Sequence, residues 1–251
     1  MKTLVIDIGG TSVKFWGPGG AKLGKVETGP DFSPQELVDA AKPYIESEGC
    51  DVVSIGYPGK IVDGHPFREP WNLGDGWVDF DFQAALGKPV RLMNDASMQA
   101  LGGYRGGCML FVGLGTSVGG ALVIDGVVAP LELGNIPFDR RNSLEETLCK
   151  RTLRRIGRAR WSRAALAVLP HLQNTFMADN VVLGGGNAKL LTGSIPAWVR
   201  LRGNHDAYLG GVRLWNARSL GTAYWFHEGE SDGQAVAQAD VAAKQAEAES
   251  K

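Results

Sequence analysis

The amino-acid sequence predicts an α/β fold made of two related domains. Strand patterns alternate with helix patterns along most of the chain, which is typical of α/β folds. In addition, one sequence pattern occurs twice, in residues 4–15 and 109–124. It consists of an apolar strand, a turn rich in Gly, Thr and Ser, and a second strand. Because two such phosphate-binding turns are far more specific than one, we expect two domains that face each other across a nucleotide.

The first of these segments places an acid, Asp7, near the end of its opening strand. We expect the glycines that follow to adopt positive φ angles and to let backbone N–H groups point at phosphate oxygens. A carboxylate at this position suits Mg²⁺ that arrives with a phosphate and is bound directly or through water. An ordinary tight hairpin is an equal alternative for this motif taken alone. The predicted hydrogen-bond donors to phosphate are Gly9, Gly10, Thr11, Ser12 and Lys14.

Composition narrows the class of protein. The 251 residues carry a net charge of −1, so no overall field favours nucleic acid or an anionic membrane as a partner. The three cysteines lie far apart, which argues against a disulfide framework or a structural zinc site. The chain opens directly on a strand, without the pattern of a signal peptide, and no apolar stretch is long enough to cross a membrane. We therefore expect a cytoplasmic protein.

The chain between the two glycine turns continues as helix, strand, helix and strand. Residues 33–36 combine a helix cap, a first-turn proline and a capping-box acid, and they predict a helix that follows. A buried strand is expected at Val52–Tyr57. A short helix at Phe82–Leu86 ends at a glycine and leads to another strand, Val90–Met93.

A loop-rich segment, residues 60–77, separates the first of these strands from the second helix. It contains Trp71, Asn72 and Trp77. Aromatic rings and amides suit a sugar, because the rings cover its apolar face and the amides bond its hydroxyl groups. A surface loop pinned by two tryptophans is at least as good an interpretation of this segment alone.

Two polar residues, Asn94 and Asp95, follow the strand that ends at Met93 and open a helix that runs to about Leu101. In an open α/β sheet, ligands bind beyond the carboxyl ends of the strands. We therefore expect Asp95 to be a general base, which accepts the proton of a substrate hydroxyl as its oxygen attacks a phosphoryl group. Asn94 is expected to orient a sugar. The alternative is an aspartate that only caps the helix.

The second glycine-rich turn contains Gly115, Thr116 and Ser117, and Glu132 follows it as a candidate ligand for sugar hydroxyls. Residues 150–163 then form a basic run. A solvated helix face explains this run about as well as the functional interpretation, which is a track for a polyanion such as polyphosphate. The members of the run are Lys150, Arg151, Arg154, Arg155, Arg158, Arg160 and Arg163.

The last third of the chain continues the alternation of helices and strands. Trp161–Met177 has a helix pattern that is kinked or restarted near Pro170. A buried strand then enters the turn Gly184-Gly185-Gly186, where a nucleotide base or ribose can lie against the backbone. We expect a strand at 196–202, a helix at 207–224 and a flexible tail at 229–251, which is rich in Ala, Gln and Glu.

Taken in order, five motifs resemble those of the ROK family of sugar kinases. The resemblance covers about residues 3 to 222. It is closest to the polyphosphate glucokinase branch, which also has Asn-Leu followed by Trp before the catalytic strand, here Asn72-Leu73 and Trp77. The five motifs are Asp7-Ile8-Gly9-Gly10-Thr11, Asn94-Asp95-Ala96, Gly113-Leu114-Gly115-Thr116-Ser117-Val118-Gly119, Glu132-Leu133-Gly134 and Leu183-Gly184-Gly185-Gly186.

This resemblance implies a two-domain actin-like ATPase (ribonuclease H-like) fold with an interdomain cleft, and a homodimer. It divides the chain into a small N-terminal α/β domain, residues 1–95, completed by the helix around 207–225, and a larger domain, residues 96–206. It also assigns roles by position. Asp95 is the catalytic base, while Asp7 and the turn from Gly9 to Ser12 bind Mg²⁺ and phosphate. Gly115 and Thr116 form the second phosphate loop, and the turn from Gly184 to Gly186 flanks adenosine. The sugar is held by Asn72, Asn94 and Glu132.

The chain also departs from the family pattern. Most members have His after Glu-Leu-Gly, where this chain has Asn135, so that an amide replaces a titratable ring among the sugar contacts. The Cys-rich zinc motif that most members carry soon afterwards is absent, as in the polyphosphate branch. Either Glu145 or Glu146 is left to replace a missing sugar-binding acid, and their spacing does not decide between them.

Together these features predict a Mg²⁺-dependent hexose kinase that forms glucose 6-phosphate from glucose, with ATP, polyphosphate or both as donor. A kinase-like sensor of a sugar or nucleotide, with little turnover, is the alternative. An actin-like ATPase without a sugar substrate would leave Asn94, Asp95 and Glu132 without a role. The predicted polyphosphate track consists of Arg151, Arg154, Arg155 and Arg158.

Overall fold

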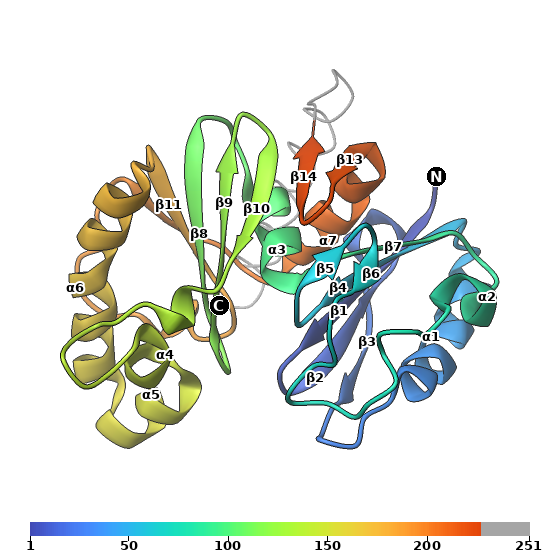
Figure 1. The fold of residues 1–251 in the computed structure, drawn as a ribbon, viewed down its shortest axis with the longest axis horizontal. Helices are drawn as coiled ribbons and strands as arrows, with labels where there is room; N and C mark the ends of the chain where they lie inside the picture. Colours follow the sequence, from blue (N-terminus) through green and yellow to red (C-terminus); the bar gives the residue numbers. More distant parts are fainter. Residues whose placement is uncertain (227–251) are drawn as a thin grey trace.

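The computed structural model describes residues 1–226 and contains two large β-sheets with a pair of helices between them (Figure 1). The first sheet has the strand order β3-β2-β1-β4-β7 and the second the order β12-β11-β8-β9-β10-β14-β13. A small two-stranded sheet, β5-β6, lies beside the first. Three helices, α4, α5 and α6, lie on the outer side of the second sheet, and α1 and α2 lie on the outer side of the first (Figure 1).

The first sheet is built from the first 94 residues. Its central strand, β1, is buried on both faces, which explains its continuous apolar run. The predicted capping box is confirmed, since Ser33 and Glu36 exchange hydrogen bonds at the start of α1. The elements are β1 (Thr3–Gly9), β2 (Ser12–Trp16), β3 (Lys22–Glu27), α1 (Pro34–Glu48), β4 (Val52–Tyr57), β5 (Ile61–Val62), β6 (His65–Pro66), α2 (Phe82–Leu86) and β7 (Val90–Asn94).

The second sheet begins with an antiparallel meander, to which β11 and β12 add parallel strands. The longest helix, α6, runs through Pro170 without interruption and buries Trp161, whose indole N–H donates to the Leu148 carbonyl. The elements are β8 (Cys108–Leu114), β9 (Val118–Ile124), β10 (Val127–Leu131), α4 (Leu144–Leu148), α5 (Lys150–Ile156), α6 (Arg158–Phe176), β11 (Asn180–Gly184), β12 (Val199–Leu201), β13 (Ala217–Leu220) and β14 (Ala223–Phe226).

Two helices, α3 (Asp95–Gly103) and α7 (His205–Arg213), pack against each other between the sheets (Figure 1). Their backbones touch because small residues face each other. A Cβ added at Gly102 would strike the Asp206 carbonyl, and one added at Gly210 would strike the Met98 carbonyl. The predicted domain boundary at residue 95 falls at the start of α3, where the chain leaves the first sheet. The division into residues 1–95 and 96–206 stays a prediction.

The structure corrects the expected helix at residues 207–224. The helix ends at Arg213, and the chain then forms a short 3₁₀ turn and the β13-β14 hairpin, which joins the second sheet beside β10. The hairpin turns at Gly221, which has a positive φ of 77°. The predicted flexible tail, residues 229–251, lies outside the described residues. Within residues 1–226, no helix is both long enough and apolar enough to cross a membrane.

Candidate functional site

The predicted site residues gather at the carboxyl ends of parallel strands. In the first sheet β1, β4 and β7 run parallel, so Gly9, Tyr57 and Asn94 mark one edge. In the second sheet β8 and β11 run parallel, and Leu114 and Gly184 mark the corresponding edge. These are the edges at which open α/β sheets bind ligands.

The first glycine turn meets the second across the two sheets. Gly9 pairs with Ser12, so Gly10 and Thr11 are the two loop residues. A Cβ added at Gly10 would lie 3.1 Å from the Thr116 Cβ and 3.4 Å from the Asn72 side-chain nitrogen. The expected positive φ angles are wrong, because neither Gly9 nor Gly10 adopts one. Gly10 therefore favours the close approach of the two turns rather than an unusual backbone conformation.

The second turn is held from two sides. The Gly115 carbonyl accepts a hydrogen bond from the Asn187 side chain at 2.9 Å and from the Lys150 backbone N–H at 3.0 Å. The Gly115 N–H donates to the Ser117 carbonyl, which leaves the exposed Thr116 at the tip. Asn187 follows the Gly184 to Gly186 turn directly, so it ties the proposed adenosine-binding turn to the proposed phosphate loop. Sequence reasoning did not single out Asn187, although an amide directly after three glycines was a usable signal.

The Gly184 to Gly186 turn fits closely under the end of β8. Gly185 has a φ of 80°, and a Cβ there would strike the Leu114 backbone. Gly186 is exposed and has open space where a Cβ would point. The turn therefore offers bare backbone beside the second glycine turn, as its predicted role requires.

Asp7 is almost completely buried, with 1% of its side chain exposed. Lys14 donates to its Oδ2 at 2.9 Å, while Oδ1 has no hydrogen-bond partner among the described residues. A buried carboxylate oxygen without a partner is costly unless a cation or a donor reaches it. No cluster of three or more His, Cys, Asp or Glu that could hold a metal occurs in residues 1–226. Mg²⁺ in phosphoryl-transfer sites needs only one or two carboxylates besides phosphate oxygens, so the Asp7 carboxylate fits it.

Asn94, rather than Asp95, caps helix α3. Its Oδ1 accepts from the Ser97 N–H at 3.0 Å, and its Nδ2 donates to Gly59 O and to Asp95 Oδ1, both at 3.2 Å. Asp95 is the first helical residue, and its Oδ1 also accepts from the Ala96 N–H at 2.8 Å. The alternative in which Asp95 is merely the cap is therefore wrong. Asn94 fixes the orientation of the Asp95 carboxylate, and its own contact with a sugar stays a prediction.

The Asp95 carboxyl has an unusual acidity. Burial raises its pKa to about 7, and the negative charges of Asp7 and Glu132 add to the effect. The Ala96 N–H and the Lys14 ammonium act in the opposite direction. A carboxyl with a pKa near neutrality can both accept and release a proton at physiological pH, which is the property of a general base or acid.

A second group of acids lies around the short 3₁₀ helix Leu133–Asn135. Desolvation by neighbouring groups raises the pKa of Glu132, although the residue is exposed, and the negative charge of Glu145 adds to the rise. Glu145 accepts from the Val118 N–H at 2.6 Å, and its side chain would lie 3.2 Å from a Cβ added at Gly134. Glu146 instead completes a capping box with Ser143 and is exposed. The structure thus brings Glu145, and not Glu146, to Glu132, while Asn135 lies exposed beside them.

The two tryptophans of the loop have different environments. Trp77 is 0% exposed and packs in the core of the first sheet against Phe32, Tyr57 and Phe82. Its predicted role in sugar binding is therefore wrong. Trp71 is 89% exposed and precedes Asn72, the residue that reaches the first glycine turn.

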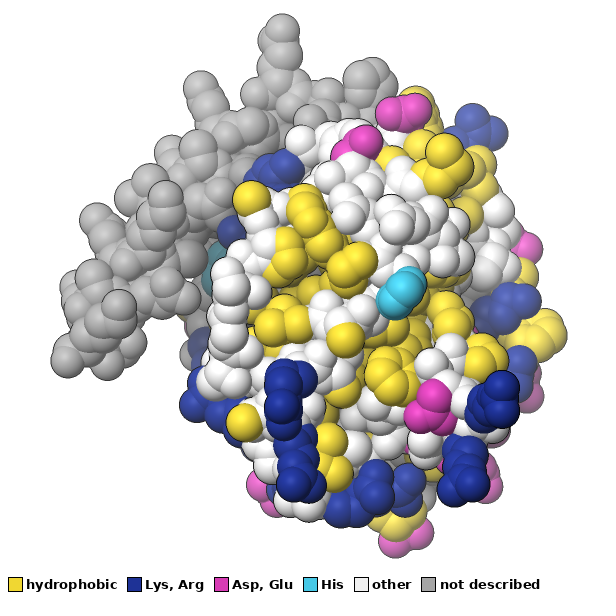
Figure 2. Space-filling view, turned by 90° about the vertical axis from the view of Figure 1, so that its left-hand side faces the viewer, with side chains coloured by type: hydrophobic (Ala, Val, Ile, Leu, Met, Phe, Trp, Pro, Cys, Tyr) yellow, Lys and Arg dark blue, Asp and Glu magenta, His cyan; other side chains and the backbone are white. Residues whose placement is uncertain are grey.

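The basic run begins beside the second glycine turn, where Lys150 opens helix α5. Lys and Arg side chains gather along the lower part of the molecular face that carries α5 and α6 (Figure 2). Burial raises the pKa of the Glu145 carboxyl, and the nearby charge of Arg151 partly opposes this rise. Arg158 donates a hydrogen bond to the Leu190 carbonyl. Arg151, Arg154, Arg155 and Arg158 are all exposed. The polyphosphate track stays a prediction.

Solved structures with this fold are known. The polyphosphate/ATP-glucomannokinase of Arthrobacter sp. strain KM matches with a TM-score of 0.69 and 23% identity, over 84% of this chain and 96% of that one. A ROK family glucokinase from Streptomyces griseus, solved with glucose and AMPPNP, matches with a TM-score of 0.66 and 19% identity, over 85% and 99%. A ROK family transcriptional regulator, a homologue of the Escherichia coli MLC protein, matches with a TM-score of 0.61 and 15% identity, over 84% and 78%.

No protein-family model matches the sequence, and neither does any curated protein. The similarity is therefore one of fold. The chain has the mixed α/β, actin-like ATPase fold of these structures, and the fold class predicted from the sequence is confirmed. Since kinases and a regulator share the fold, the activity has to be argued from the residues of the site.

Proposed function

We propose that this protein is a sugar kinase that transfers a phosphoryl group to a hexose hydroxyl, with glucose as the first candidate. The observation that carries the proposal is the Asp95 carboxyl. It lies just after the end of β7, near the charges of Asp7 and Glu132, and its pKa is raised to about 7. A regulator would have no need of a carboxylate tuned to exchange a proton near neutral pH. The fold neighbours include glucokinases, which agrees with this proposal.

Each part of the site then has a task in phosphoryl transfer. The sugar hydroxyl lies against Asp95, which accepts its proton as the oxygen attacks the terminal phosphoryl group of the donor. The two glycine turns, which meet at Gly10 and Thr116, offer donors to the phosphates from opposite sides. Mg²⁺ bound with the donor would neutralise phosphate charge, and the buried Asp7 would hold it directly or through water.

The sugar is expected to lie between the loop that carries Asn72 and the acids near Leu133–Asn135. Glu132 and Glu145 accept hydrogen bonds from the sugar hydroxyl groups. Asn135 contributes an amide, which does not titrate, at the position where most members of the ROK family have a histidine ring. Glu145→Gln keeps an oxygen for the Val118 N–H but loses a charged acceptor, so hexose affinity should fall roughly tenfold. Glu146→Gln is the matched control, because Gln can also complete the capping box of α4 with Ser143, so neither the stability nor the hexose affinity should change much.

For the donor we propose ATP, with polyphosphate as a second donor that the basic run favours. One fold neighbour is described as using both. Exposed guanidinium groups at Arg154 and Arg155 lie in the last turn of α5, whose first residue touches the second glycine turn. Replacing both by Gln should raise the KM for polyphosphate far more than the KM for ATP. Arg163→Gln, an exposed arginine of α6, is the matched control. Equal effects on both donors would contradict the track.

The deciding experiment is a coupled phosphorylation assay over a panel of hexoses with Mg²⁺ and either ATP or polyphosphate. The expected result is sugar-dependent turnover that is lost in Asp95→Asn. Absence of turnover with every sugar, together with a melting temperature that a hexose still raises, would instead support a sugar sensor. A sensor would retain hexose binding in Asp95→Asn, which the same thermal measurement detects.

A further inference from the structure

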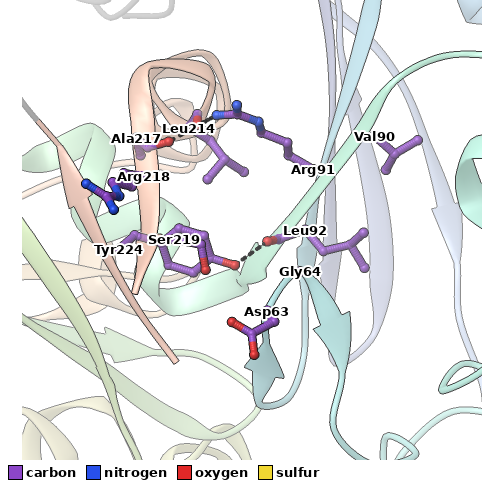
Figure 3. A pocket seen from close by; sticks show the side chains of 10 residues that line it. All are labelled: Asp63, Gly64, Val90, Arg91, Leu92, Leu214, Ala217, Arg218, Ser219 and Tyr224. Atoms are coloured by element: carbon purple, nitrogen blue, oxygen red, sulfur yellow. Dashed lines mark hydrogen bonds between the residues drawn. The ribbon is translucent and has the colours of Figure 1, made fainter. Parts of the chain in front are cut away.

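A cavity lies beside the start of β7, away from the end of the strand that leads into Asp95, where the two large sheets approach each other. It has a volume of about 550 Å³, within the range of small-molecule sites. One wall comes from the β5-β6 hairpin and the first half of β7, and the other from the chain between α7 and β14 (Figure 3). The lining residues are Asp63, Gly64, Val90, Arg91, Leu92, Leu214, Ala217, Arg218, Ser219 and Tyr224.

Interactions made by three residues, Arg91, Tyr224 and Asp63, join the two walls of the cavity. Arg91 Nη1 donates to the Leu214 carbonyl at 2.7 Å and to the Ala217 carbonyl at 3.1 Å, while its guanidinium carbon lies 4.8 Å from the centroid of the Trp215 ring. The Tyr224 hydroxyl donates to the Leu92 carbonyl at 2.7 Å. The Asp63 N–H donates to the Gly221 carbonyl at 3.2 Å. These bonds make the cavity a built feature of the fold rather than a gap between loops.

The charged side chains of the cavity have hydrogen-bonding groups that are available to a ligand. Arg91 uses only Nη1 for its two hydrogen bonds, so Nε and Nη2 have no hydrogen-bond partner among residues 1–226. Arg218 and Asp63, which lie on different walls, are exposed and form no ion pair with another described residue (Figure 3). Arg91 and Arg218 line the cavity from its two opposite walls, and guanidinium groups favour a phosphate, which they can bind through paired N–H donors. Asp63, on the same wall as Arg91, offers a carboxylate that favours hydroxyl donors, and apolar side chains also line the cavity.

We propose that this cavity binds a small phosphate monoester with a hydroxyl-bearing body, its phosphate at Arg91 and Arg218 and a hydroxyl at Asp63. Sugar phosphates and nucleoside monophosphates share this chemistry. The site is separate from the Asp95 site, because its lining takes the beginning of β7 and not the residues that follow its end. The proposal goes beyond phosphoryl transfer and does not depend on it.

Isothermal titration calorimetry on the full chain tests the proposal, with glucose 6-phosphate in one arm and AMP in the other. Glucose, Mg²⁺ and AMPPNP are present in excess to occupy the Asp95 site. Arg218→Ala should weaken binding roughly tenfold, since it removes one of two guanidinium groups. Asp63→Asn should weaken binding of the ester but leave that of inorganic phosphate unchanged. Arg163→Ala, an exposed arginine on α6, should behave as the unmodified chain does.

Binding in one arm alone identifies the source of the phosphate, a sugar or a nucleoside. The proposal is overturned if neither ester binds at about 1 mM. It is also overturned if Arg218→Ala binds the ester as tightly as the control Arg163→Ala and the unmodified chain do. Binding that is lost in Asp95→Asn but kept in Arg218→Ala would assign the ester to the Asp95 site and also overturn it. Because Arg218 is exposed, folding of its variant is expected to be normal, and a melting curve checks this. Calorimetry requires no turnover, so a negative kinase assay leaves this test intact.

Discussion

Replacing Asp95 by Asn is expected to make the protein more stable while it abolishes the proposed transfer. The two side chains have nearly the same shape, and the Asn oxygen can still accept the hydrogen bond from the Ala96 N–H. What the variant loses is a carboxyl whose pKa rises from its ordinary value of 3.8 to about 7 in the folded protein. The native side chain therefore opposes folding whenever it is ionised.

The size of the effect follows from the pKa difference. A carboxyl with a higher pKa in the folded chain binds its proton more tightly there, so the free energy of unfolding falls as the pH rises from 3.8 to about 7. At about 1.36 kcal/mol per pH unit the whole fall is about 4 kcal/mol. The Asn variant lacks this dependence. We expect it to be more stable than the native chain by about 2 kcal/mol near pH 5 and by about 4 kcal/mol near pH 8.

Urea unfolding of both proteins near these two pH values, with EDTA present to remove Mg²⁺, measures the difference. Asp75→Asn, at an exposed loop acid, is the control and should change the stability by less than about 0.5 kcal/mol at either pH. A gain that is the same at both pH values would show that the Asp95 carboxyl is not strained by its surroundings. A loss of stability near pH 8 would refute the electrostatic reasoning entirely.

Three further predictions concern the same site. Lys14→Met leaves the buried Asp7 carboxylate unpaired and should lower the free energy of unfolding by about 3–5 kcal/mol, which urea unfolding measures; adding Asp7→Asn should restore much of it. Gly10→Ala places a Cβ against Thr116 and should lower kcat at least about tenfold, and Thr116→Ser should recover part of the loss by removing the nearby methyl group. The pH profile of kcat/KM should rise through about pH 7 as the general base ionises, and Glu132→Gln should move the midpoint down by removing a negative charge that favours the protonated form. A midpoint that stays in place would show that the rate reports another group.

The sequence predicted four of the five strands of the first sheet, though not its edge strand β3, because the signals for those strands are local. The capping box before α1, the buried run of β4 and the glycine after α2 each act through neighbouring residues. The β13-β14 hairpin was missed because helix-compatible residues around Leu214 extend the pattern of α7. Only pairing with β10, far away in the chain, favours a strand there. The run of three strand-favouring aromatic residues, Tyr224-Trp225-Phe226, shortly after Gly221 was the signal that could have indicated it.

At the site, residue types were easier to predict than their partners. Asp95 and the two glycine turns were identified from motifs, and the structure brings Gly10 and Thr116 into contact. The choice between Glu145 and Glu146 could not be made from spacing, because it depends on which of them caps α4 and which turns toward Gly134. Trp77 was misassigned because a buried and an exposed indole look alike in a sequence. The cavity lined by Arg91 and Arg218 was also beyond prediction, since its walls come from residues more than a hundred positions apart.

The late position of the β13-β14 hairpin in the chain has a consequence for biosynthesis. The core of the first sheet draws on residues between Leu4 and Leu92, so it can assemble as soon as that stretch has left the ribosome. The core beneath α3 also needs Tyr224 and Phe226, and until they are made β10 has an unpaired edge. A nascent chain paused before residue 217 therefore carries an open strand next to an exposed apolar surface. Folding of this protein during synthesis should therefore depend on chaperones, or on rapid synthesis of β13 and β14, more than is usual for a protein of this size.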